Sequence, residues 1–510
     1  MLSLKMWKIK KRGALLGAST IVYMVAIMAY FQYFVPTSEG NLGLLVVLHP
    51  IVFLLTVFPV IRFYLRRGYW FNLTNFMSIL IYIYLGFGSM YYVTFFHDLS
   101  HETLRYPNAA LKTFGLVCLA AFVFRLGSIT PFAANVARAM PVRISTPEFG
   151  VRIKAGIIVS VGLTFLIKMY MIASGRFGVT GDSFGSETSI QSVGIYFTLI
   201  KYIEQLGILA GLVGFYYWFS GAKLNRFTKL TLIFFLVIMS FMAVMSGMKA
   251  QLLHVILMVI IPASLVGVKQ RRELVRLRTY LIVFALFISF WVISPFYRAI
   301  MVADTQSSSV TSAAVNTVDS LGKGAALVSE SMDGDSFVIK QIDVIWSRVS
   351  LFRYFNSVVA QTPEEIDYRG WERYPYLPFA FVPRAILPGK PINDYSAQFN
   401  VDYIAPIYNS TTPSTVGWAY MEGGILGIFI LMFALGFFYG VVDRYTFVNC
   451  QLSIYGVTVF GAVFIEFANL EPDPFWLFSG IIHEIFILAL AYVLIFMRVS
   501  FNKSNVRVIA

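Results

Sequence analysis

The sequence has few charged residues for its length. Asp, Glu, Lys and Arg together make up only 13% of the 510 residues, whereas soluble domains usually contain about 25%. Hydrophobic residues make up 58% of the chain, and the mean hydropathy is +0.72. These values exclude an ordinary soluble enzyme and indicate an integral membrane protein.

Cysteine is also scarce, and the two that occur do not predict a disulfide framework. Cys118 lies inside an apolar run and Cys450 lies beside one. The net charge of +14 does not indicate nucleic-acid binding, because most basic residues lie in short clusters between apolar runs. Neither a metal nor a cofactor is predicted, since the His97 and His101 pair has no evident third ligand.

Long apolar runs are the main feature of the sequence. A helix needs about 20 apolar residues to cross a bilayer, and the sequence therefore predicts an all-α polytopic membrane protein with about twelve spans. They lie near residues 14–35, 43–61, 75–96, 108–128, 155–173, 195–219, 230–247, 251–268, 279–301, 415–441, 453–469 and 474–497.

The distribution of Lys and Arg between these runs predicts the orientation. One set of connecting segments holds 24 basic residues and the short segments of the alternate set hold three, as expected when the basic side is cytosolic. The first run has no clear cleavage site and is interpreted as an uncleaved span. Both termini are therefore expected in the cytosol.

One hydrophilic segment, 302–414, separates the predicted membrane regions 1–301 and 415–510. It lies on the non-cytosolic side and contains eight basic and twelve acidic residues. Three- and four-residue hydrophobic steps within 336–360 predict an amphipathic helix at the membrane surface. Five prolines between Trp371 and Pro391 then exclude a long helix.

Basic residues among aromatic ones suit an anionic lipid headgroup that bears a sugar, because Arg and Lys bind phosphate oxygens and aromatic rings stack on sugars. The alternative, that these arginines pair with acids of the loop or with lipid phosphates, stays open. The candidate ligands of the pyrophosphate and glycan are Arg298, Arg348, Arg353, Arg373, Arg384, Lys390, Tyr395 and Trp418.

Residues 345–445 resemble the Wzy-type oligosaccharide repeat-unit polymerases, which build O-antigen, capsule and exopolysaccharide. The resemblance rests on Arg348-Val-Ser-Leu-Phe-Arg353-Tyr, on Val-Pro383-Arg384 with Leu-Pro-Gly-Lys390-Pro391, and on Pro413-Ser414-Thr-Val-Gly417-Trp followed by Glu422-Gly423-Gly424-Ile-Leu-Gly427. The paired Arg-x10-Gly motifs of some members are missing. The resemblance implies a GT-C-like glycosyltransferase of the bacterial inner membrane that uses undecaprenyl-pyrophosphate-linked oligosaccharides, with a chain-length regulator and a flippase as candidate partners.

Such a reaction needs cations beside the departing pyrophosphate and a base for the attacking sugar hydroxyl. The candidate bases are Glu372, Asp394, Asp402, Glu422 and Glu484. Gly423 and Gly424 allow close approach of a ligand to Glu422. By contrast, Gly427, Gly436 and Gly440 predict tight helix packing, and Lys201 with Glu204 predicts a neutralising pair on one helix.

Two other functions stay open. An O-antigen ligase would share the scaffold and the lipid donor, but ligases of that type use a histidine in the large periplasmic loop, and residues 302–414 contain none. A flippase or transporter of twelve spans often shows internal repeats, and no matching halves are evident. The polymerase is therefore favoured.

Overall fold

The computed structural model describes residues 40–67, 69–90, 106–141, 147, 150–173, 194–245, 249–270, 350–380, 382, 387, 398–404, 412–496, 499–502 and 505–508. Almost all of the regular structure in these ranges is helical. The elements are α2 Gly40–Arg67, α3 Leu73–Ile81, η1 Tyr82–Phe87, α4 Gly88–Met90, η2 Pro107–Ala109, α5 Ala110–Ile129, α6 Pro131–Ala139, α7 Val151–Ala173, α9 Gly194–Phe219, α10 Arg226–Met245, α11 Lys249–Gln270, α15 Phe352–Gln361, η5 Tyr374–Phe379, η6 Asn400–Ile404, α17 Ser414–Arg444, η7 Tyr445–Asn449, α18 Ile454–Phe467, α19 Pro474–Ala491, η8 Tyr492–Phe496, β1 Val499–Asn502 and β2 Asn505–Val508.

Within the described residues, seven helices are long and apolar enough to cross a membrane: α2, α5, α7, α10, α11, α17 and α19. The predicted all-α membrane class is thus confirmed in this coarser form. The predicted span at 453–469 contains the 14-residue helix α18, which at 1.5 Å per residue is about 21 Å long and too short to cross alone. The predicted spans at 14–35 and 279–301 lie outside the described residues, and so does most of the predicted amphipathic helix, apart from α15 at its end.

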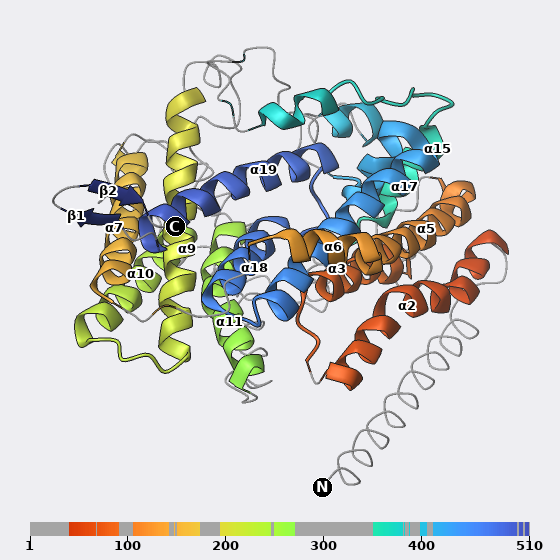
Figure 1. Ribbon diagram of the computed structural model, residues 1–510. Coiled ribbons are helices and arrows are strands. Elements are labelled where there is room, and N and C mark those ends of the chain that lie inside the picture. Colours follow the sequence, from red (N-terminus) through yellow and green to blue (C-terminus); the bar gives the residue numbers. More distant parts are fainter. Residues whose placement is uncertain are drawn as a thin grey trace, which may run out of the picture.

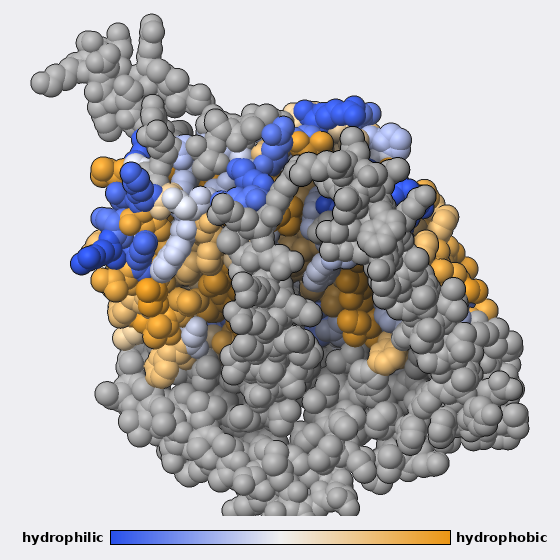
Figure 2. All heavy atoms as spheres, turned by 90° about the horizontal axis from the view of Figure 1, so that it is seen from below, coloured by the Kyte–Doolittle hydropathy of each residue, from blue (hydrophilic) through white to orange (hydrophobic). Residues whose placement is uncertain are grey.

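Apolar side chains cover outward faces that a soluble protein would bury. On α10, the exposed residues Phe227, Leu230, Phe234, Val237 and Phe241 follow three- and four-residue steps and therefore form one stripe. Figure 2 shows hydrophobic residues over much of the described part of one face, with hydrophilic residues gathered along one edge. Continuous apolar surface of this extent is compatible with contact to lipid.

The helices form two groups with α18 and α19 between them (Figure 1). One group contains α7, α9, α10 and α11, and the other contains α2, α3, α5, α6 and α17. The C-terminal residues depart from the predicted all-α class, because β1 and β2 form a short antiparallel hairpin with Val499 opposite Val508.

Among the described helices, the most extensive contact joins α5 and α17, and glycine makes it possible. A Cβ at Gly436 would lie 2.0 Å from the Phe124 carbonyl oxygen, and one at Gly440 would lie 2.4 Å from that of Ser128. Small residues let helix backbones approach closely in this way, so the packing prediction is confirmed for both glycines. Gly427 differs, because its added Cβ would meet the carbonyl oxygen of Ala419, earlier in α17 itself.

Candidate functional site

Helix α17 is broken at Gly423 and Gly424, one residue after Glu422. Gly424 has φ +62° and ψ −137°, a left-handed conformation that glycine adopts without a steric penalty. The break leaves the last carbonyl groups of the first half-helix without partners in the helix. The backbone N–H of Arg369 donates to the Met421 oxygen at 2.8 Å, and that of Gly370 donates to the Glu422 oxygen at 3.1 Å. The segment that follows α15 thus caps the first half of α17.

The same segment covers the glycine pair with two aromatic side chains. A Cβ at Gly424 would lie 2.7 Å from the Tyr368 hydroxyl, and one at Gly423 would lie 3.3 Å from the Trp371 ring. The sequence predicted that these glycines allow another group to approach the backbone closely, and the structure shows such an approach. In this structure, the groups that approach the backbone are side chains of the chain itself.

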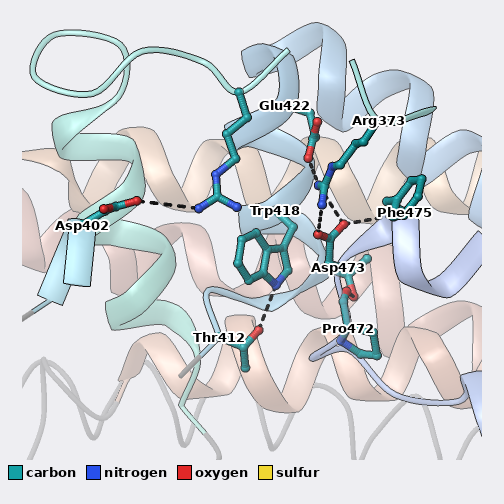
Figure 3. A network of polar contacts seen from close by, with 10 residues as sticks. Arg373, Asp402, Thr412, Trp418, Glu422, Pro472, Asp473 and Phe475 are labelled. Carbon is teal, nitrogen blue, oxygen red and sulfur yellow. Dashed lines mark hydrogen bonds and ion pairs between the residues drawn. The ribbon is translucent and has the colours of Figure 1, made fainter. Parts of the chain in front are cut away.

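Arg373 lies beside this break and contacts two carboxylates (Figure 3). Its guanidinium donates to Glu422 Oε1 and to both oxygens of Asp473, with Nη2 at 3.0 Å from Asp473 Oδ1. Asp473 also accepts the backbone N–H of Phe475 at 2.9 Å, as the N-cap of α19. One side chain therefore joins the break in α17 to the start of α19.

The three charged groups are buried together. The exposed fractions are 7% for Arg373, 1% for Glu422 and 5% for Asp473. The rings of Phe475 and Tyr374 lie 5.4 and 5.9 Å from the guanidinium carbon, a geometry that favours a cation. Buried charges persist only when they are paired, yet one guanidinium here faces two carboxylates. Among the residues that the structure describes, none donates a hydrogen bond to Glu422 Oε2.

A second arginine, Arg369, lies near this cluster. Its guanidinium is 5.1 Å from the Trp418 ring and 3.9 Å from Asp402, and Trp418 Nε1 donates to Thr412 Oγ1 at 3.1 Å (Figure 3). Burial, and then the positive charge of Arg373, lower the pKa of Arg369. Arginine nevertheless keeps its charge in proteins, so Arg369 adds a cation next to an aromatic surface.

The structure brings together four of the predicted site residues, Glu422 and Arg373 in direct contact, and Trp418 and Asp402 through Arg369. It places three others elsewhere. Glu372 is exposed although it precedes Arg373 in the chain. Arg353, on α15, donates to its neighbour Tyr354 at 2.5 Å.

Glu484 is buried on α19 and lines a small pocket with Gln205 and Glu466. It follows Asp473 by eleven residues, which is about 16 Å along a helix. Outside the described residues lie Arg298, Arg348, Arg384, Lys390, Asp394 and Tyr395.

Sequence reasoning missed Asp473 and Arg369. A usable signal existed for Asp473, because Pro472-Asp473-Pro474 places a preferred N-cap residue before a proline at the first helical position. No comparable signal marks Arg369, whose surroundings depend on the fold. Glu204 pairs with Lys168 of α7, a partner that the sequence did not indicate, whereas the side chain of Lys201, its predicted partner, lies outside the described part of the structure.

The described part of the chain is almost entirely helical, and seven of its helices are long and apolar enough to cross a membrane. These features define the class of the protein. The particular family follows from its sequence. Residues 156–508 match the model of a domain of unknown function, DUF8712, and because this match covers more than half of the chain, the protein belongs to that family. The matched region contains Arg373, Glu422 and Asp473. No curated protein and no solved structure matches the chain.

Proposed function

We propose that this protein is a polysaccharide polymerase of the bacterial inner membrane, with cytosolic termini and its large loop on the periplasmic side. It transfers a growing glycan from undecaprenyl pyrophosphate to the non-reducing end of an incoming undecaprenyl-pyrophosphate-linked repeat unit. One observation supports this assignment most directly. A buried carboxylate, Glu422, is fixed through one oxygen at a break in a long apolar helix, while its second oxygen has no donor among the described residues.

The arrangement suits a general base. A base must be ionised before it can accept a proton, and Arg373 supplies a positive charge in direct contact with Glu422. The attacking sugar hydroxyl would give its proton to Glu422 Oε2 while its oxygen bonds to the anomeric carbon. The bond from that carbon to the pyrophosphate oxygen breaks, and undecaprenyl pyrophosphate leaves with the electron pair.

Aromatic groups near the break suit the sugar. Trp371 is partly exposed and lies over Gly423, whereas Trp418 is buried under the guanidinium of Arg369 and positions that cation. Aromatic rings present an apolar face with a polar edge, which is the pattern that the C–H face of a sugar ring requires. The cations that stabilise the departing pyrophosphate are then expected among Arg369 and the other basic residues of the loop.

The broken helix also supports a second candidate from another class. Transporters commonly form their substrate sites at discontinuous membrane helices, and α17 is interrupted beside a buried ion-pair cluster. A flippase for polyprenyl-linked oligosaccharide is therefore the alternative.

The test is deletion of the gene in its host, followed by complementation with the native chain, Glu422→Gln or Asp367→Asn. Asp367 is an exposed acid of the same segment and serves as the matched control. For a polymerase, deletion reduces the surface glycan to a single repeat, and only Glu422→Gln fails to restore the long chains. Full-length polymer left on its lipid carrier would indicate a ligase, repeats left facing the cytosol would indicate a flippase, and an unchanged ladder would exclude all three.

A further inference from the structure

Two partly exposed side chains cover the break in α17, next to Glu422. Tyr368, whose hydroxyl lies over Gly424, is 40% exposed. Trp371, over Gly423, is partly exposed. A ligand group that displaces these two side chains would reach the break, one residue from Glu422, whose Oε2 has no donor among the residues that the structure describes.

The charges around that oxygen select the ligand. Arg373 contacts both Glu422 and Asp473, so the three buried groups in direct contact carry one positive and two negative charges. Arg369 adds a second positive charge near Asp473, but Asp402 lies 3.9 Å from it, so these five groups together still carry one excess negative charge. Charges interact more strongly at a buried site than in water. An acceptor oxygen in this environment favours a hydroxyl or an ammonium group as its donor and repels a carboxylate or a phosphate.

We propose that the position beside Glu422 binds a neutral or amino sugar and rejects an acidic sugar. This inference rests on the proposed function, in which the acceptor sugar presents its hydroxyl to Glu422. It also changes the role assigned to Arg373 from the sequence. Arg373 neutralises and orients carboxylates, so the lipid pyrophosphate binds at other cations of the loop.

The test measures weak sugar binding to the full-length purified protein in detergent micelles by saturation-transfer NMR. The probes are the methyl glycosides of glucose, glucosamine and glucuronic acid and of their galactose counterparts, at a pH where the amine is protonated. In at least one series, we expect the amino sugar to bind best and the uronic acid to bind at least tenfold more weakly. Equal binding of all three, tightest binding of the uronic acid, or no binding by any probe would overturn the proposal.

Two variants test whether the preference for the amino sugar over the uronic acid arises from the buried charges of Arg373, Glu422 and Asp473. Asp473→Asn removes the excess negative charge and should reduce the tenfold difference to about threefold or less, whereas Asp367→Asn removes an exposed charge of the same segment and should leave the difference unchanged. If Asp473→Asn fails to fold, Glu422→Gln answers the same question, because it also neutralises the cluster and should abolish the preference for the amine. Since binding is measured without turnover, a failed deletion experiment and a failed binding experiment are distinguishable.

Discussion

The two glycine pairs of α17 differ in what lies against them. Gly436 and Gly440 face the backbone of α5, at Phe124 and Ser128, and leave no room for a side chain. Gly423 and Gly424 face the side chains of Trp371 and Tyr368, and Gly424 has a left-handed backbone. The first pair therefore joins two helices, and the second breaks one helix.

This difference divides α17 into two parts. The half after the break packs on α5 through backbone contacts that cannot adjust without moving a helix. The half before the break is held by capping hydrogen bonds from Arg369 and Gly370 and by the ion pairs of Arg373. Side chains and loop segments can move more easily than packed helices. A reactive group is thus expected at the break and not where Gly436 and Gly440 pack against α5.

Replacing Arg373 with Met should have the largest effect. The substitution leaves Glu422 and Asp473 buried without their shared cation, and removing one partner of a buried ion pair costs about 3–5 kcal/mol. We expect a marked decrease in the thermal unfolding temperature of the protein in detergent. Exposed Arg152 on α7 provides the control, and Arg152→Met should be close to neutral. Equal stability of the two variants would show that the buried cluster contributes little.

Gly436→Val tests the close contact between α5 and α17 and should have the next largest effect. Its Cβ would overlap the Phe124 carbonyl oxygen, a backbone atom that moves only with α5, so we expect destabilisation of about 3 kcal/mol. Gly115→Ala on α5 is the matched control, because a Cβ there meets nothing within 4 Å. Size-exclusion chromatography and thermal unfolding should separate the two variants clearly. Native-like behaviour of Gly436→Val would contradict the close contact.

Gly424→Ala tests the break, with an expected cost of about 2 kcal/mol from the left-handed backbone. The contact with Tyr368 contributes less, because its hydroxyl is at the end of a side chain on the surface. Adding Tyr368→Phe should therefore recover only a minor part of the loss, as measured by thermal unfolding. Full recovery in the double variant would show that crowding, and not backbone conformation, requires glycine here.

The sequence predicted an apolar, helical membrane class because hydrophobic runs of membrane length are local features. It also named Glu422, Arg373 and Trp418 as candidates, and the structure places these three residues in one region of the protein. The ion pair from Arg373 to Asp473 joins residues 100 positions apart, and neither its existence nor its charge balance can be read from local spacing. The contact between Glu204 and Lys168 shows the same limit, because it joins two different helices.

The smallest predicted effect concerns Asp443, near the far end of α17. Its two carboxylate oxygens accept the backbone N–H groups of Leu73 and Thr74 at 2.9 and 3.0 Å, and Asn72 accepts that of Asn75 at 2.7 Å. Asp443 thus caps α3 from a different helix. Asp443→Asn keeps one acceptor and should cost about 1 kcal/mol. Hydrogen exchange should become faster at the start of α3 and stay unchanged at the break in α17. Faster exchange at both places would show that the two halves of α17 are coupled and would contradict their division at Gly423 and Gly424.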